Sequence, residues 1–234
     1  MPQFAPGQTL FIDADDTLWE NYVYFERAIA DFIRYLNHNQ YSPSEVRRAL
    51  NDVERETIVN HGYGLPSFTR ALLACFEQLS AAPVTEEKRQ RVLGIARAIA
   101  DQEIELLPGV AETLAELSTR HRLILMTKGD QAEQSGKLAR SGVSQHFSAV
   151  EIVQEKDSAA YRKVLHRHGL TPQTSWMIGN SPKSDINPAL TAGLNAVFLF
   201  NKNTWILEHD TLDAAPPGQQ LLELDSFAEL CGIF

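Results

Sequence analysis

Short apolar runs that alternate with segments of helical length are the feature that most constrains the fold of this chain. Polar and apolar residues do not alternate within these runs, which is typical of strands buried on both faces of a parallel sheet. Strands that alternate with helices form right-handed crossover units, so the sequence predicts a Rossmann-like α/β sheet with helices on both faces. The predicted strands are Thr9–Ile12, Leu123–Met126, Val150–Val153, Trp176–Ile178, Ala196–Phe200 and Leu221–Leu224, and the predicted helices among them are Val110–Leu117, Gln131–Val143, Ser158–His168 and Pro182–Ala192.

One long interval interrupts this alternation. From Glu20 to about Leu107 the sequence contains no strand candidate and only helical patterns. Within it, Ser42 to Glu45 matches a capping box with Pro43 at the first helical position. We therefore predict an α/β core made of residues 1–19 and 106–234, with an all-helical segment, residues 20–105, inserted after the first strand.

Composition excludes several classes of protein. The chain of 234 residues has 21 Lys and Arg against 30 Asp and Glu, a formal charge of −9. General nucleic-acid binders usually carry a basic patch, so no nucleic-acid partner is expected, although one local cationic pocket could still bind a phosphorylated substrate. No run approaches the roughly 20 apolar residues of a membrane-spanning helix, and the N-terminal segment lacks the features of a secretory signal.

The two cysteines, Cys75 and Cys231, lie far apart and have no metal-ligand spacing. This pattern favours two reduced, packed thiols. We therefore expect a soluble protein of a reducing compartment, the cytoplasm. The sequence leaves the oligomeric state open.

Ligands of open α/β sheets bind at the carboxyl ends of the strands, so the residues after each strand are the candidate site. Asp13, Asp15 and Thr17 follow the first predicted strand. Thr127 and Lys128 follow the second, and the remaining strand ends supply Lys156, Asn180 and Asp185. Each residue alone is more often a turn or surface residue, but their occurrence in this order points to one site.

Asp13 and Asp15 are two residues apart, and Asp185 is expected beside them. Carboxylates gathered in this way predict a bound divalent cation, because their like charges would otherwise force protonation. Mg²⁺ suits a site with few carboxylates, completed by waters and phosphate oxygens of a substrate. Lys156 and the backbone N–H groups near Thr127 could hold the remaining phosphate charge.

These residues resemble the motifs of the haloacid-dehalogenase-like (HAD) hydrolase superfamily. The first motif, an apolar strand followed by DxDxT, matches Phe11 to Thr17, and the second, an apolar strand ending in Thr or Ser, matches Leu123 to Thr127. Lys156 best matches the third, and Trp176 to Asp185 the fourth. A helical insertion after the first motif resembles the C1 cap of the phosphoglycolate-phosphatase-like and nucleotidase-like members.

The resemblance implies a Mg²⁺-dependent phosphatase that hydrolyses a small phosphorylated metabolite through an aspartyl-phosphate. Asp13 would be the nucleophile and Asp15 the general acid and base. Three residues, Thr127, Lys128 and Lys156, would bind phosphate. The metal would be held by Asp13, Asp185 and the backbone carbonyl of Asp15. Thr17 and Asn180 would have supporting roles.

Two positions depart from the common pattern. Asp16 stands where Gly is common, and Asn180 where many members carry Asp. An amide can still bind a metal-bound water but supplies no charge, so we expect somewhat weaker metal binding than with two acids.

Three alternatives remain open at this stage: a phosphomutase, a haloacid dehalogenase, and a catalytically inactive HAD fold used for binding. A phosphonate-cleaving member would need a lysine in the cap, and Lys88, the single lysine there, is expected to be solvated.

In the helical segment, Tyr63 lies between two glycines and is a candidate substrate contact. Trp19 could contact substrate or seat the hinge, and we favour the hinge.

Overall fold

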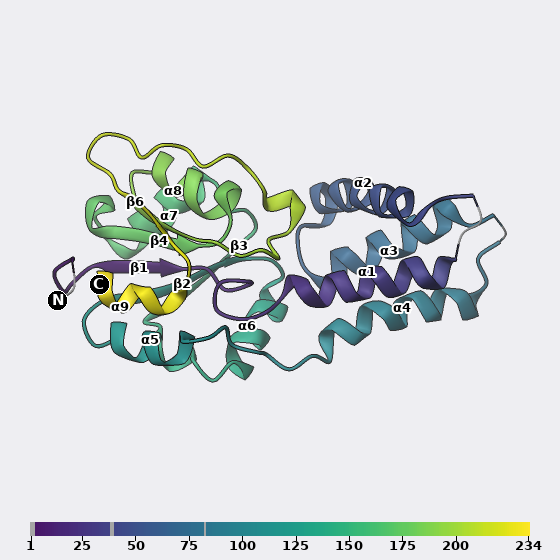
Figure 1. The fold of residues 1–234 in the computed structure, drawn as a ribbon, viewed down its shortest axis with the longest axis horizontal. Helices are drawn as coiled ribbons and strands as arrows, with labels where there is room; N and C mark the ends of the chain where they lie inside the picture. The colour runs from purple at the N-terminus through teal and green to yellow at the C-terminus, as the bar shows by residue number, and fades with distance from the viewer. Residues whose placement is uncertain (1–2, 38–39, 82) are drawn as a thin grey trace. The chain divides into compact units, whose positions relative to one another are not determined.

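Six parallel strands form the sheet of the α/β part, in the order β3-β2-β1-β4-β5-β6 (Figure 1). The computed structural model describes residues 3–37, 40–81 and 83–234. Every neighbouring pair of strands is parallel, which confirms the predicted α/β class. The strands are β1 (Thr9–Ile12), β2 (Arg122–Lys128), β3 (Ala149–Val153), β4 (Ser175–Gly179), β5 (Asn195–Leu199) and β6 (Leu221–Leu224).

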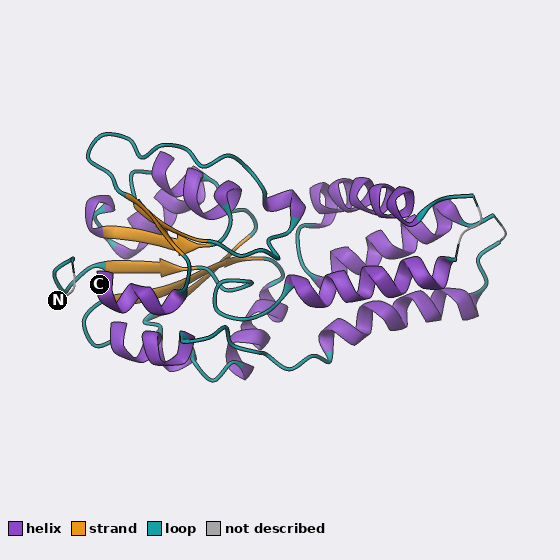
Figure 2. Ribbon diagram, viewed as in Figure 1, coloured by secondary structure: helices purple, strands orange, loops and turns teal. Residues whose placement is uncertain are grey.

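Helices cover both faces of this sheet (Figure 2). Alternate residues of a strand point to opposite faces, so Leu10 and Ile12 of β1 pack in one cluster and Phe11 in another. The first cluster includes residues of α5 (Val110–Leu117), α6 (Gln131–Arg140) and α9 (Leu230–Ile233). The second includes residues of α7 (Ser158–His168) and α8 (Asn187–Thr191).

Two predicted helices are shorter in the structure. The α6 helix ends at Arg140, three residues before the predicted end, and Gly142 follows with a φ of 73°, a left-handed conformation that stops a helix. The predicted helix from Pro182 to Ala192 is divided into a π-helical turn, Pro182–Ile186, and α8. Pro188 has no N–H to donate, which removes a hydrogen bond at this junction.

The chain divides into two compact units, one made of Met1–Tyr22 with Ile104–Phe234 and one of Val23–Glu103. The two segments of the first unit that lead to and from the second are hydrogen-bonded to each other. The backbone N–H of Glu20 donates to Glu105 over 2.9 Å, and that of Leu107 donates to Leu18 over 2.9 Å. This pairing holds together the two segments through which the chain leaves and re-enters the first unit.

Helices supply most of the described residues of the second unit: α1 (Tyr22–Leu36), which begins one residue before it, α2 (Pro43–His61), α3 (Leu65–Leu79) and α4 (Glu86–Ala100). The predicted capping box of α2 is present, with the Ser42 side chain and Glu45 each accepting a backbone N–H. The amphipathic faces meet in one apolar cluster that includes Phe32, Leu50 and Leu72. In this cluster Cys75 is a free, buried thiol, and Cys231 is also free. In the described ranges, no helix combines the length and the apolar character needed to cross a membrane.

The helical cluster yields a stability prediction. Replacing the fully buried Leu72 by Ala leaves a cavity, so we expect L72A to lower the free energy of unfolding by about 2–5 kcal/mol. Thermal and chemical denaturation followed by circular dichroism will measure the loss. V59A, at a side chain that is 85% exposed, is the control and should be near neutral. Equal effects of the two changes would contradict the assigned packing.

Candidate active site

The central strand β1 places Asp13 at the carboxyl edge of the sheet, where β2 and β4 flank it. The Asp13 N–H donates to the carbonyl of Ile178 over 2.9 Å, which continues the parallel ladder one residue past β1. Thr127 lies near the end of β2 and is buried. Because all these strands are parallel, the residues that follow them meet at one edge, as the sequence predicted.

A buried lysine joins two of the predicted carboxylates. The Lys156 ammonium donates to Asp13 Oδ1 in a close ion pair and to Asp185 Oδ1 over 2.7 Å. All three side chains are at least 90% buried. Burial disfavours the charge of Lys156, but the nearby Asp13 and Asp185 outweigh it and raise the pKa of this lysine. Burial also disfavours the charged form of Asp13 and raises the pKa of this carboxyl group, although Lys156 opposes that shift.

The charges of this triad, defined here as Asp13, Lys156 and Asp185, do not balance. Two carboxylates face one ammonium, so the triad is net negative whenever Asp13 is ionised, and it presents hard oxygen donors in a buried place. A divalent cation would offset that charge, so these residues fit Mg²⁺. In the part of the chain that the structure describes, no group of three or more His, Cys, Asp or Glu side chains is placed to hold a metal. The fit therefore rests on two carboxylates, with backbone or water oxygens completing the shell.

The π-helical turn after β4 fixes the position of Asp185. Asp185 Oδ2 accepts the Ser181 N–H over 3.0 Å, and the Ser181 carbonyl accepts the Asp185 N–H over 2.9 Å. Gly179 makes room for this carboxylate, because a Cβ built there would lie 2.3 Å from Asp185 Oδ2. A side chain at residue 179 is thus incompatible with the observed position of Asp185.

Thr17 and Asn180 connect the first and fourth motifs. The Thr17 hydroxyl lies 2.9 Å from Asp13 Oδ2 and 3.2 Å from Asn180 Oδ1, and its single hydrogen is shared between them. Asn180 Nδ2 donates to the Thr204 hydroxyl over 2.9 Å. These bonds orient the Asp13 loop, consistent with the supporting roles expected for both residues.

The Asp15 side chain points to a different set of partners. Its carboxylate accepts bonds from Trp19 Nε1 and Gln134 Nε2, each over 2.8 Å, and from Lys137 Nζ over 3.0 and 3.1 Å. Burial opposes the charge of Asp15, but Lys137 and the two hydrogen bonds prevail and lower its pKa. The Trp19 ring is fully buried, so its contacts favour the hinge interpretation over contact with substrate.

Asp16 explains why glycine is common at its position. Its φ is 63°, in the left-handed region that favours glycine. The aspartate offsets that cost with its side chain, whose Oδ1 accepts the N–H groups of Asn21 and Tyr22 over 2.9 and 3.0 Å. Both N–H groups lie where α1 begins, so Asp16 ties the first motif to the start of that helix.

Lys128 contacts residues that the sequence did not suggest as its partners. Its ammonium donates to Glu208 Oε1 over 2.6 Å and to the Ser184 hydroxyl over 2.7 Å. Burial would raise the pKa of Glu208, but Lys128 and the hydroxyls of Ser184 and Ser181 lower it. The assignment of Lys128 to phosphate remains a prediction, and its observed contacts favour a structural role.

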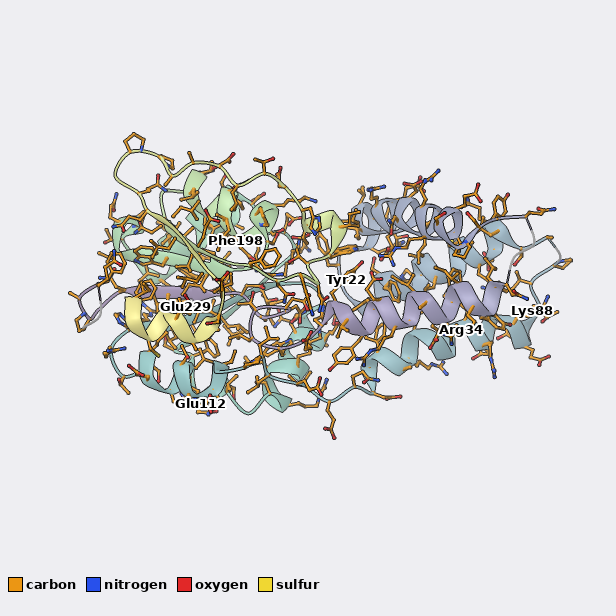
Figure 3. The ribbon with its side chains drawn as sticks, viewed as in Figure 1. Tyr22, Arg34, Lys88, Glu112, Phe198 and Glu229 are labelled. Atoms are coloured by element: carbon orange, nitrogen blue, oxygen red, sulfur yellow. The ribbon has the colours of Figure 1, made fainter. Side chains whose placement is uncertain are left out.

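In the helical unit, Tyr63 follows α2 and is half-buried. Its contact with substrate also remains a prediction. Lys88 lies in the first turn of α4 and is exposed, which fits the solvated lysine expected there (Figure 3).

Sequence reasoning missed several partners of the site, among them Gln134, Lys137 and Glu208. Gln134 and Lys137 are three residues apart in α6, so they share one helix face, and this spacing was the available signal. Glu208 ends a short 3-10 helix, Ile206–Glu208, nine residues after β5, and no local pattern marks it.

Comparison with known proteins agrees with this geometry. A family model described as haloacid dehalogenase-like hydrolase matches residues 8–193. A HAD-like hydrolase structure from Xanthomonas campestris superimposes with a TM-score of 0.81 at 28% identity, covering 97% of this chain and 93% of that one. A magnesium-bound HAD hydrolase from Bacillus subtilis, at 17% identity and a TM-score of 0.64, covers 96% of this chain and 97% of that one and shares the fold.

Curated relatives include phosphatases. Phosphoserine phosphatase of Thermus thermophilus is 30% identical over 140 residues, 57% of this chain and 55% of the relative. Human N-acylneuraminate-9-phosphatase is 32% identical over 107 residues, 44% of this chain and 43% of the relative. The chain thus spans about half the length of the curated relatives it matches.

The family model covers most of the chain, and the structure places the motif residues at the carboxyl edge of one parallel sheet. This chain belongs to the haloacid dehalogenase-like hydrolase family.

Proposed function

We propose that the protein is a Mg²⁺-dependent phosphatase that hydrolyses a small phosphorylated metabolite through an aspartyl-phosphate on Asp13. The observation that carries the proposal is the buried triad of Asp13, Lys156 and Asp185, in which two carboxylates face one ammonium. The phosphatases among the curated relatives of this chain support the same type of reaction.

Asp13 is suited to nucleophilic attack because its loop is fixed. Thr17 binds one of its oxygens and Lys156 the other, so the carboxylate is held in one orientation. Attack of Asp13 on phosphorus forms the aspartyl-phosphate and releases the alcohol, and water then hydrolyses the intermediate. Lys156 and Thr127 would bind the phosphoryl oxygens, and Lys156 would also offset charge as the anions approach.

Mg²⁺, when bound by Asp13 and Asp185 with the Asp15 carbonyl, supplies electrostatic stabilisation of the phosphoryl oxygens. The Ser181 N–H already orients the Asp185 carboxylate that would take this role. Burial disfavours the ionised form of Asp13, and a cation beside it favours the ionised form that acts as nucleophile.

Asp15 would donate a proton to the leaving alcohol and then accept one from water. In the observed conformation its oxygens are bound to Trp19, Gln134 and Lys137. General acid catalysis therefore requires the carboxylate to leave this set of partners. The roles of residues 20–105 as a cap and of Tyr63 as a substrate contact remain predictions from the sequence.

Replacement of the nucleophile tests the reaction. We expect D13N to lower kcat for p-nitrophenyl phosphate by about 10³-fold or more, because an amide cannot form the intermediate. Phosphate release with and without Mg²⁺, for this substrate and a panel of sugar, amino-acid and nucleoside phosphates, is the measurement. D225N, at an exposed carboxylate, is the control. Substantial Mg²⁺-dependent turnover by D13N would contradict the proposal.

Leaving groups test the role of Asp15. General acid catalysis contributes about 10²–10⁴-fold, and an alkoxide needs it more than a nitrophenolate. We therefore expect D15N to lose more kcat on an alkyl phosphate than on p-nitrophenyl phosphate. The kcat ratio of the two substrates in wild type and variant is the measurement. An unchanged ratio would exclude Asp15 as the acid of the first step.

Gly179 tests the position of Asp185. A methyl group at residue 179 would displace that carboxylate, so we expect G179A to raise the Kd for Mg²⁺ by about tenfold or more. Calorimetric titration of the protein with Mg²⁺ gives the Kd without relying on activity. G94A is the matched control, since a Cβ there meets no atom within 4 Å. Equal Kd values for G179A and wild type would contradict the assigned metal site.

A further inference from the structure

A largely buried ion pair between Lys128 and Glu208 connects the end of β2 to the segment after β5 at the carboxyl edge of the sheet. We propose that this pair is a positioning element for the Asp185 loop, that it sets the affinity for Mg²⁺, and that Lys128 is not a phosphate ligand. The inference rests on the metal site of the proposed function.

The Glu208 carboxylate makes contacts to residues from two other strand ends. Its Oε1 accepts from Lys128 at the end of β2 over 2.6 Å. Its Oε2 accepts from the hydroxyls of Ser181 and Ser184, in the segment after β4, over 2.7 and 2.5 Å. Glu208 itself lies in the segment after β5. One carboxylate therefore connects the end of β2 with the segments that follow β4 and β5.

The two serines connect Glu208 to Asp185. The Ser181 hydroxyl has one hydrogen, and giving it to Glu208 turns its lone pairs toward the Ser184 N–H, which donates to it over 2.9 Å. The Ser181 N–H in turn holds Asp185 Oδ2 over 3.0 Å. Loss of the Glu208 carboxylate would free Ser181 and Ser184 to rotate, and the turn that orients Asp185 would loosen.

The ammonium of Lys128 is already committed. An ammonium has three donors, and those of Lys128 reach Glu208, Ser184 and, over 3.4 Å, Glu155. Its side chain is 13% exposed and that of Glu208 is 11% exposed, so solvent screens this pair little. A phosphate ligand would have to break the pair, whereas Lys156 is directed at Asp13 and Asp185.

Four variants, E208Q, K128M, K128R and the double variant of E208Q with K128M, test the inference. The Kd for Mg²⁺ is measured by calorimetry without substrate, and binding of inorganic phosphate is measured the same way at saturating Mg²⁺. D210N and K163M are matched controls, because they make the same chemical changes at exposed side chains. Circular dichroism and thermal unfolding report the folding of each variant, and S184A is a milder probe of the same network.

We expect E208Q and K128M each to raise the Kd for Mg²⁺ by about tenfold. Loss of a group that orients a metal ligand typically has an effect of this size, and both changes act on Asp185 through Ser181 and Ser184. The double variant should be no weaker than either single one, because both changes break one interaction. K128R keeps the charge and should restore most of the affinity. Phosphate binding at saturating Mg²⁺ should stay unchanged in all of them.

Two results would overturn the inference. The first is a Kd for Mg²⁺ in folded E208Q and K128M, or in S184A if those do not fold, equal to that of the controls. The second is phosphate binding that weakens in K128M alone, which would make Lys128 a phosphate ligand. A wild-type protein that binds Mg²⁺ but hydrolyses no phosphomonoester would contradict the proposed function, and the comparison of Kd values would still decide the inference.

Discussion

The ion pairs of Lys156 with Asp13 and Asp185 are the interaction on which the rest of the site depends. Three charged side chains are buried together, which costs solvation free energy that only mutual attraction and further hydrogen bonds can offset. The surrounding structure supplies those bonds: Thr17 binds Asp13, and the Ser181 N–H binds Asp185. The excess carboxylate charge is what makes the place suitable for a divalent cation.

Two polar networks surround this triad. In one network, Lys137 and Gln134 of α6 bind the Asp15 carboxylate. In the other, Lys128 and Glu208 bind the segment that carries Asp185. Each network connects segments that are distant in the chain, so the positions of Asp15 and Asp185 depend on those bonds.

The order of the strands explains why a small number of residues can assemble here. β1 is central and pairs with β2 and β4, so the segments that follow these three strands are neighbours. Because the strands are parallel, polar residues placed after each one meet without any long connection. The charged residues of the site follow these strands, so they lie at the edge of the sheet.

The sequence by itself determined the α/β class, the strand positions to within about two residues and the edge where the site lies, because apolar periodicity and the motif residues are local signals. It also placed Asp13, Lys156 and Asp185 together, since each follows a strand of one parallel sheet. Only the tertiary structure decided the partners of Asp15 and Lys128, because these depend on α6 and on the segment after β5 meeting residues more than 70 positions away. Gln134, Lys137 and Glu208 acquire their roles through that packing, and no pattern within their own segments encodes which carboxylate or ammonium they will meet.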